Sequence, residues 1–114
     1  MTFTRVLAQA AVDDVEAAER WYACLFDAPP DARPMDGLLE WHLTPAGGVQ
    51  VWRDRERAGR SCVLVGVGAP EDLDQLADRL AAAGVQHGGV EPGGGARLLR
   101  LTDPGGNLVV VAGP

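Results

Sequence analysis

A carboxylate and an imidazole alternate with apolar residues in the segment Glu40-Trp41-His42-Leu43. Successive side chains of a strand point to opposite faces, so Glu40 and His42 would share one face and the apolar pair the other. A carboxylate beside an imidazole can serve as a general base or can hold a ligand through hydrogen bonds. The same pattern is also typical of a half-buried strand whose polar face meets solvent, and this alternative stays open.

A second alternating pair follows at Gln50 and Trp52. If Gln50 points into a cavity, Trp52 does as well, and its indole face can stack on a planar ligand, although core packing is an equally ordinary role for a tryptophan. Amide and guanidinium groups elsewhere could complete such a site by hydrogen bonding or by pairing with an anionic group. The predicted ligand-binding residues are Gln9, His42, Gln50, Trp52 and Arg100.

The remaining reactive side chains do not form a catalytic group. Cys24 lies in a helical stripe and Cys62 is expected to begin a buried strand, and neither has a neighbouring cation that would favour a thiolate. His87 lies in a Gly-rich stretch, where we expect a solvated histidine. Residues 93–95 are three glycines, but the stretch lacks the lysine of a phosphate-binding loop. We therefore predict no catalytic residue.

Composition excludes several classes of protein. The 114 residues carry a net charge of −6 and contain no lysine, which disfavours binding to a nucleic-acid backbone. Two cysteines are too few for a disulfide-stapled secreted domain. There is no apolar run of the length that crosses a membrane and no secretory signal pattern. We expect a cytoplasmic protein that binds neither nucleic acid nor membranes.

Each half of the chain predicts the same order of elements. The first half predicts a strand at 6–11, a helix at 15–25 and a hairpin of strands at 38–43 and 49–52. The second half predicts a strand at 62–67, a helix that begins after Ala69-Pro70 and ends at Gly84, a weak strand at 85–90, and a hairpin of strands at 97–101 and 108–112. Between the halves lies a mixed-charge stretch with no large apolar side chain, which we interpret as a flexible linker.

The two halves form a weak internal repeat. Val12 and Val67 both end the first strand of a half and lie 55 positions apart. Neither half can bury its own apolar face, so the halves must pack on each other or on a second chain. The prediction is one α+β domain with pseudo-twofold symmetry, divided into module 1 (1–53), a linker (54–60) and module 2 (61–114).

Three motifs carry a resemblance to a known family: residues 12–15 (Val-Asp-Asp-Val), residues 21–26 (Trp-Tyr-Ala-Cys-Leu-Phe) and the turn at 102–107 (Thr-Asp-Pro-Gly-Gly-Asn). With the repeated layout, they resemble the vicinal oxygen chelate superfamily, which includes glyoxalases, extradiol dioxygenases and bleomycin-resistance proteins. The resemblance covers essentially the whole chain. It implies paired βαβββ modules that curl into a half-open barrel with a ligand cavity, commonly in a homodimer. Whether the modules pair within a chain or swap between chains stays open.

The enzymes of this superfamily hold a divalent metal with one residue from each of four strands, typically His, Gln or Glu. The matching positions here are Leu7, Gln50, Cys62 and Val110. Only Gln50 resembles the family's ligands, whereas such a metal needs three or more converging N or O donors. We therefore predict no metal and no cofactor.

The resulting expectation is a metal-free protein of the bleomycin-resistance type, which would sequester a small aromatic or cationic molecule and so confer antibiotic resistance. The alternative is a glyoxalase-like lyase or isomerase, or another enzyme of this fold, with a divergent or absent metal site and with His42 or Glu40 as general base. A third possibility is a subunit whose cavity is vestigial and whose role is association.

Overall fold

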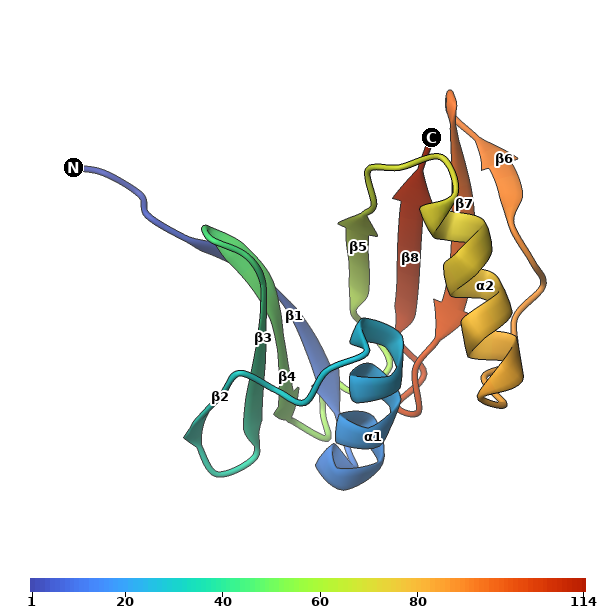
Figure 1. Cartoon of the computed structure of the whole chain (residues 1–114). Coiled ribbons are helices and arrows are strands. Elements are labelled where there is room, and N and C mark those ends of the chain that lie inside the picture. Colours follow the sequence, from blue (N-terminus) through green and yellow to red (C-terminus); the bar gives the residue numbers. More distant parts are fainter.

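Two four-stranded sheets, each accompanied by one helix, make up the computed structural model, which describes residues 1–114 (Figure 1). The first module comprises β1 (Val6–Val12), α1 (Val15–Phe26), β2 (Ala32–Met35), β3 (Leu38–Thr44) and β4 (Gly47–Arg53). The second comprises β5 (Cys62–Gly66), α2 (Asp72–Ala82), β6 (Glu91–Gly93), β7 (Ala96–Thr102) and β8 (Leu108–Gly113). The predicted repeat of strand, helix and further strands is therefore confirmed.

The sheets have equivalent strand orders, β1-β4-β3-β2 and β5-β8-β7-β6. In each, the first and last strands of the module pair in parallel, and the other pairs are antiparallel. The helix of the module supplies the crossover that a parallel pair requires. Both sheets stay open, and no closed barrel forms.

Local sequence explains both helices. Asp14 caps α1, because its carboxylate accepts a hydrogen bond from the backbone N–H of Ala17 at 3.0 Å. Asp27 then ends α1 in the left-handed conformation with φ of 54°. Helix α2 follows Pro70, and the carboxylate of Asp72 in its first turn accepts from the N–H of Ala69 at 2.9 Å.

Two predictions about strands are wrong. The segment 85–90 forms no strand, because His87 ties it to α2: its Nε2 lies 2.9 Å from the carbonyl oxygen of Ala77, and its Nδ1 accepts from the N–H of Gly89 at 3.0 Å. His87 is therefore half-buried rather than solvated. The strand β2 was missed because it is a polar edge strand containing Pro34, which period-two reasoning overlooks.

One apolar core unites the two modules. We call the sheet faces that contact this core the inner faces and the opposite faces the outer faces. In Figure 1, α1 lies between the two sheets and α2 lies in front of the second sheet, over β7. The two helices contribute the buried residues Ala18, Tyr22, Leu25, Leu73, Ala77 and Leu80. The first sheet contributes Ala10, Val12, Leu39, Trp41, Val49 and Val51, and the second contributes Val63, Leu99, Leu101, Val109 and Val111. Because strands alternate, the residues between these positions belong to the outer faces.

The turn between β7 and β8 fastens the modules together through buried polar groups. The carboxylate of Asp103 accepts from the hydroxyl of Tyr22 at 2.7 Å and from the Asn107 amide at 2.8 Å. That amide also donates to the carbonyl of Ala11 at 2.7 Å, and its oxygen accepts from the N–H of Ser61 at 2.9 Å. Burial, together with the hydrogen bond to Asp103, raises the pKa of Tyr22, so its hydroxyl stays protonated as a donor.

Residues 54–60 form a hydrogen-bonded turn beside this network. The N–H of Ala58 donates to the carbonyl oxygen of Asp54 at 3.0 Å. The N–H of Asp54 donates to the carbonyl oxygen of Val12 at 2.9 Å.

Neither of the two helices has the length and apolar character that would let it cross a bilayer.

The buried Asn107 amide gives a test of this junction. We expect Asn107→Ala to lower the free energy of unfolding by about 2 to 4 kcal/mol, because the groups that it pairs lose their partners inside the protein. Chemical denaturation followed by circular dichroism measures the change. The control Gln86→Ala removes an exposed amide and should cost less than about 0.5 kcal/mol. Equal effects of the two substitutions would contradict the proposed role of the turn.

Candidate functional site

A row of polar side chains crosses the outer face of the first sheet. The amide nitrogen of Gln9 donates to the side-chain oxygen of Gln50 at 2.8 Å, and the amide nitrogen of Gln50 donates to Glu40 at 2.5 Å. The second carboxylate oxygen of Glu40 lies 2.9 Å from Nε2 of His42. Backbone register places Gln9, Gln50 and Glu40 side by side on β1, β4 and β3. We call Gln9, Gln50, Glu40 and His42 the polar row.

Glu40 is the buried centre of the polar row, with 5% of its surface exposed. Gln50 is half-buried and Gln9 and His42 are exposed, so the strand face that carries the row meets solvent around a buried Glu40. The hydrogen bond from His42, then the one from Gln50, lowers the pKa of Glu40 below its ordinary value, and the charge of Arg5 adds to the effect. The buried carboxylate is thus held ionised by partners on its own and the neighbouring strand.

The side chain of His42 is 40% exposed, and one ring nitrogen faces Glu40. When Nε2 carries the proton that faces Glu40, Nδ1 keeps a lone pair that can accept a proton or a hydrogen bond from a ligand. The carboxylate would stabilise the imidazolium that forms on proton transfer. The pair can therefore bind a donor group or act as a base.

A β-bulge sets the direction of His42. Trp41 pairs with Val49 and Thr44 pairs with Gly47, so two residues of β3 lie opposite Gly48 alone. A Cβ atom on Gly48 would lie 2.0 Å from the carbonyl oxygen of Trp41, so only glycine fits there. The backbone N–H of His42 also donates to the carboxylate of Asp31 at 2.7 Å. The pair Gly47-Gly48, which falls between the two strands of the predicted hairpin, is the sequence signal for this bulge.

Of the other predicted residues, Trp52 adjoins the polar row and Arg100 does not. Trp52 is half-buried on β4, two positions after Gln50 and so on the same outer face. Arg100 lies on β7 of the second sheet, where it pairs with Glu91. It lines a different hollow, together with Trp21 and His87. Four of the five predicted residues, Gln9, His42, Gln50 and Trp52, therefore lie on the outer face of the first sheet within one chain. Glu40, which was not among the predicted ligand-binding residues, lies with them.

The donors available for a metal do not fit the superfamily's metal site. No three His, Cys, Asp or Glu side chains converge anywhere in the structure. Leu7 and Val110 offer no donor atoms, and both carboxylate oxygens of Glu40 already accept hydrogen bonds. Cys62 is exposed at the start of β5 rather than in a buried strand. We therefore derive no reaction step through a metal.

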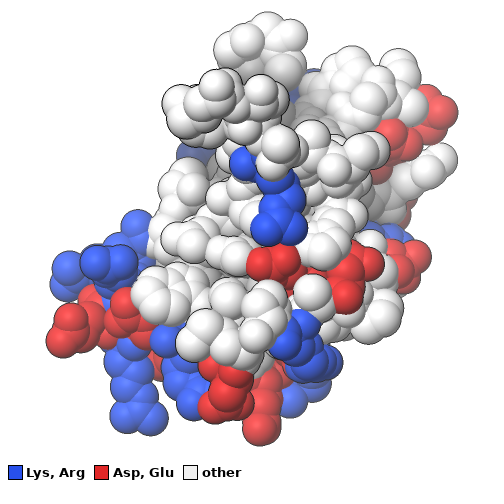
Figure 2. All heavy atoms as spheres, turned by 90° about the vertical axis from the view of Figure 1, so that its left-hand side faces the viewer, with Lys and Arg blue, Asp and Glu red and all other residues white.

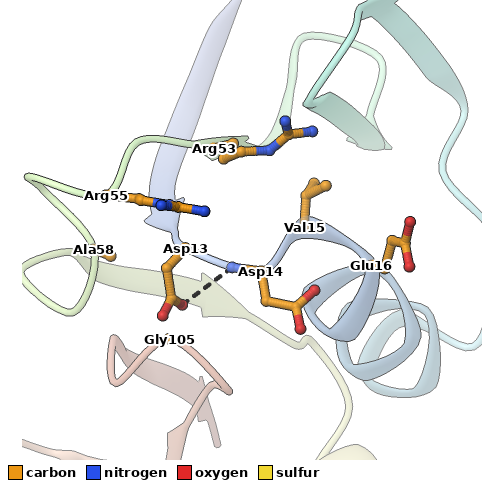
Figure 3. A pocket seen from close by; sticks show the side chains of 8 residues that line it. All are labelled: Asp13, Asp14, Val15, Glu16, Arg53, Arg55, Ala58 and Gly105. Carbon is orange, nitrogen blue, oxygen red and sulfur yellow. Dashed lines mark hydrogen bonds between the residues drawn. The ribbon is translucent and has the colours of Figure 1, made fainter.

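A separate, polar hollow of about 890 Å³ lies at the start of α1. Figure 3 shows Arg53 and Arg55 on one side of it and Asp13, Asp14 and Glu16 on the other. Asp13 and Asp14 accept backbone hydrogen bonds at this end of the helix. These carboxylates are accounted for by helix capping, and none of the predicted site residues lies there.

Charges of both signs are mixed over the side of the molecule that Figure 2 presents, which is the left-hand side of Figure 1. Red and blue side chains alternate over its lower part, and uncharged surface dominates above them. The net charge of −6 is therefore not gathered into an acidic patch on this side.

Comparison with known proteins identifies the fold. No protein-family model and no curated protein matches the chain. Among solved structures, a glyoxalase/bleomycin resistance protein from Catenulispora acidiphila is 26% identical, with a TM-score of 0.81 over 96% of this chain and 97% of that one. A lactoylglutathione lyase from Agrobacterium tumefaciens is 16% identical, with a TM-score of 0.76 over 95% and 91%. A glyoxalase-related enzyme from Fulvimarina pelagi is 20% identical, with a TM-score of 0.71 over 96% and 86%. The resemblance to the vicinal oxygen chelate fold is confirmed.

The bulge can be tested through its glycine. We expect Gly48→Ala to lower the free energy of unfolding by about 1 to 3 kcal/mol, because the added methyl group forces the strands apart. The ring signals of His42 in an NMR spectrum should shift with it. Gly68→Ala is the matched control, since a Cβ there meets nothing within 4 Å. A Gly48→Ala variant that keeps the wild-type stability and His42 signals would disprove the steric argument.

Ionisation of Glu40 predicts a pH dependence. Its pKa is lowered in the fold, so its contribution to stability is complete above the ordinary glutamate pKa and is lost as pH falls through the lower, folded-state pKa. Glu40→Gln should therefore be less stable than the wild type at pH 6, and the difference should shrink toward pH 3. Urea denaturation at both pH values measures it. Glu56→Gln, on an exposed turn, makes the same change of charge as a control. A difference that does not shrink would contradict an ionised, hydrogen-bonded Glu40.

Proposed function

We propose that the outer face of the first sheet is a wall of a binding site for a small planar organic molecule with cationic character, and that the protein sequesters this molecule. The hydrogen-bonded polar row beside Trp52 is the observation that carries the proposal. Its side chains are already held by one another, so binding would not have to order them. Their free donors and acceptors would orient the ligand.

The preference for a planar cation rests on two neighbouring groups. Trp52 presents an indole ring that can stack on a flat ligand and attract a positive charge. Glu40 supplies a buried, ionised carboxylate on the same face. The similarity in fold to the glyoxalase/bleomycin resistance protein from Catenulispora acidiphila is compatible with sequestration and equally with catalysis, so the preference for sequestration rests on the side chains of the polar row and Trp52. A role in antibiotic resistance in the cytoplasm belongs to this proposal.

We propose further that the working unit is a homodimer in which modules of two chains complete each site. Within one chain, Arg100 and the polar row lie in different sheets. Strands β1 and β5 are both sheet edges, and Leu64 on β5 leaves 65% of its surface exposed. Joining the outer faces of two chains would cover these groups and could bring Arg100 of one chain toward the polar row of its partner.

The second candidate function is catalysis, supported by the contact between His42 and Glu40. In that case Nδ1 of His42 would remove a proton from the substrate, and Glu40 would stabilise the imidazolium. The similar fold of the lactoylglutathione lyase from Agrobacterium tumefaciens raises the same alternative, although the donors described above do not fit a metal site. A purely associative subunit is the third possibility, and it predicts no binding at the polar row.

Calorimetric titration with bleomycin, with ethidium as a simple planar cation and with 2-naphthoate as a planar anion tests the proposal. We expect bleomycin and ethidium to bind and 2-naphthoate to bind at least tenfold more weakly. Trp52→Leu should weaken ethidium binding about tenfold, which corresponds to about 1.4 kcal/mol. Trp21→Leu removes an indole from α1, away from the polar row, and should leave the affinity unchanged.

Two further measurements separate the alternatives. S-lactoylglutathione formation from methylglyoxal and glutathione, assayed with and without added Ni²⁺ or Zn²⁺, should stay at the uncatalysed rate. Turnover that His42→Asn abolishes would replace sequestration by catalysis. Binding of none of the three compounds would refute sequestration, and absence of turnover as well would favour an associative role. Light scattering of the purified protein tests the homodimer, and a monomer at all concentrations would reject it.

A further inference from the structure

An apolar cavity of about 420 Å³ lies between the two modules, on the inner side of the sheets. Its walls come from both helices and three strands, and they include Phe26, Leu43, Val65, Leu76 and Val111. Its polar lining consists of Asp72, Gln75 and Arg79, all from α2. A volume of this size with apolar walls and few polar groups is typical of a site for a small molecule.

This cavity is separate from the polar row. Val65 and Val111 occupy the inner faces of β5 and β8, whereas the polar row lies on the outer face of the first sheet. The two sites share no residue. Leu43 is 41% exposed, and Leu76 is half-buried. An apolar ligand that covers them would gain the free energy of removing this surface from water.

Arg79 gives the cavity a fixed positive charge. Its guanidinium donates to the carbonyl oxygens of Cys24 and Leu25 at 2.5 and 2.8 Å, which holds it at the end of α1. Five other arginines pair with carboxylates, but Arg79 pairs with none. Two of its five N–H donors are used, so the others remain for a ligand.

The single carboxylate in the lining does not cancel this charge. Asp72 lies seven residues before Arg79, about 10 Å away along the helix axis. Its side chain already accepts a hydrogen bond from the N–H of Ala69 at the start of α2. The cavity therefore has apolar walls, a cation held in place at one end, and a carboxylate engaged at the other.

We propose that this cavity binds an amphipathic anion: an aromatic or alkyl body that fills the space between the modules and one carboxylate or sulfonate that pairs with Arg79. The apolar body contacts Leu43 of the first module and Val65 of the second, so binding stabilises the junction of the two modules. The guanidinium is ordered before the ligand arrives, and this lowers the entropic cost of binding.

A pair of fluorescent probes separates the two parts of this proposal. 1-Anilinonaphthalene-8-sulfonate carries the anion, and N-phenyl-1-naphthylamine is its uncharged counterpart. We expect the wild-type protein to bind the sulfonate with a stoichiometry of one per chain and decanoate to displace it. Arg79→Met should weaken sulfonate binding at least tenfold and change binding of the uncharged probe less than threefold. Leu76→Trp should fill the cavity and abolish binding of both.

Matched variants control for charge and folding. Arg55→Met removes an arginine from the hollow at the start of α1 and should leave both probes unaffected. Arg79→Lys keeps the charge and should restore part of the sulfonate affinity, which a loss caused by misfolding would not show. Each variant's thermal unfolding is measured beside binding.

Three outcomes would overturn the proposal. Equal losses of both probes in Arg79→Met would remove the role of the cation. Sulfonate binding that survives Leu76→Trp would place the probe elsewhere. Failure of the wild type to bind either probe, with a change of oligomeric state in Leu76→Trp, would assign the cavity to a contact with a second copy of the chain. None of these depends on ligand binding at the polar row.

Discussion

The relative position of the two modules depends on a buried carboxylate that has to be satisfied. Asp103 is 3% exposed and accepts hydrogen bonds from the side chains of Tyr22 and Asn107 and from two backbone N–H groups of its own turn. A buried charge without these donors would be strongly destabilising. Because Tyr22 lies on α1 and Asn107 also contacts Ala11 and Ser61, the carboxylate is satisfied only when both modules are docked.

This docking gives the two faces of each sheet different roles. The inner faces pack against α1 and α2 and form the shared core with them. At this core the ring centroids of Tyr22, Phe26 and Trp41 lie within 6.0 Å of one another. The outer faces lie away from this core; the face of the first sheet carries the polar row, and that of the second is largely apolar around Leu64 and Val110. The cavity beside Arg79 is a consequence of the same packing, since the helices do not fill the whole space between the inner faces.

The protein keeps the fold of a superfamily known for metal chemistry, yet its side chains suit other interactions. The family resemblance predicts that Leu7 and Val110 occupy two of the metal-ligand positions, and neither side chain carries a donor atom. The oxygen and nitrogen atoms of the polar row form hydrogen bonds with one another. What the outer face offers is hydrogen bonding, stacking on Trp52 and a local negative charge at Glu40. The fold alone does not distinguish binding from catalysis, because function lies in these side chains.

The regular elements were predictable where local signals were strong. Periodicity and capping gave α1 to within one residue at its end, and β3, β4, β7 and β8 differ from expectation by one or two residues at their ends. The polar edge strand β2 and the loop held by His87 were not predictable, because contacts with β3 and with Ala77, rather than local propensity, fix their conformations. The alternation Glu40-Trp41-His42 correctly separated a core tryptophan from two polar neighbours.

The sequence by itself determined the repeat, the helices, most strands and the placement of Gln9, Gln50 and His42 on one kind of face, because these follow from periods of two and 3.6 residues along the chain. Only the tertiary structure decided that Glu40 is buried and joins those residues, that Arg100 is not beside them, and that a cavity with Arg79 lies between the modules. These depend on strand register, on the bulge at Gly48 and on the docking of two modules, and each is fixed by contacts between residues far apart in the chain.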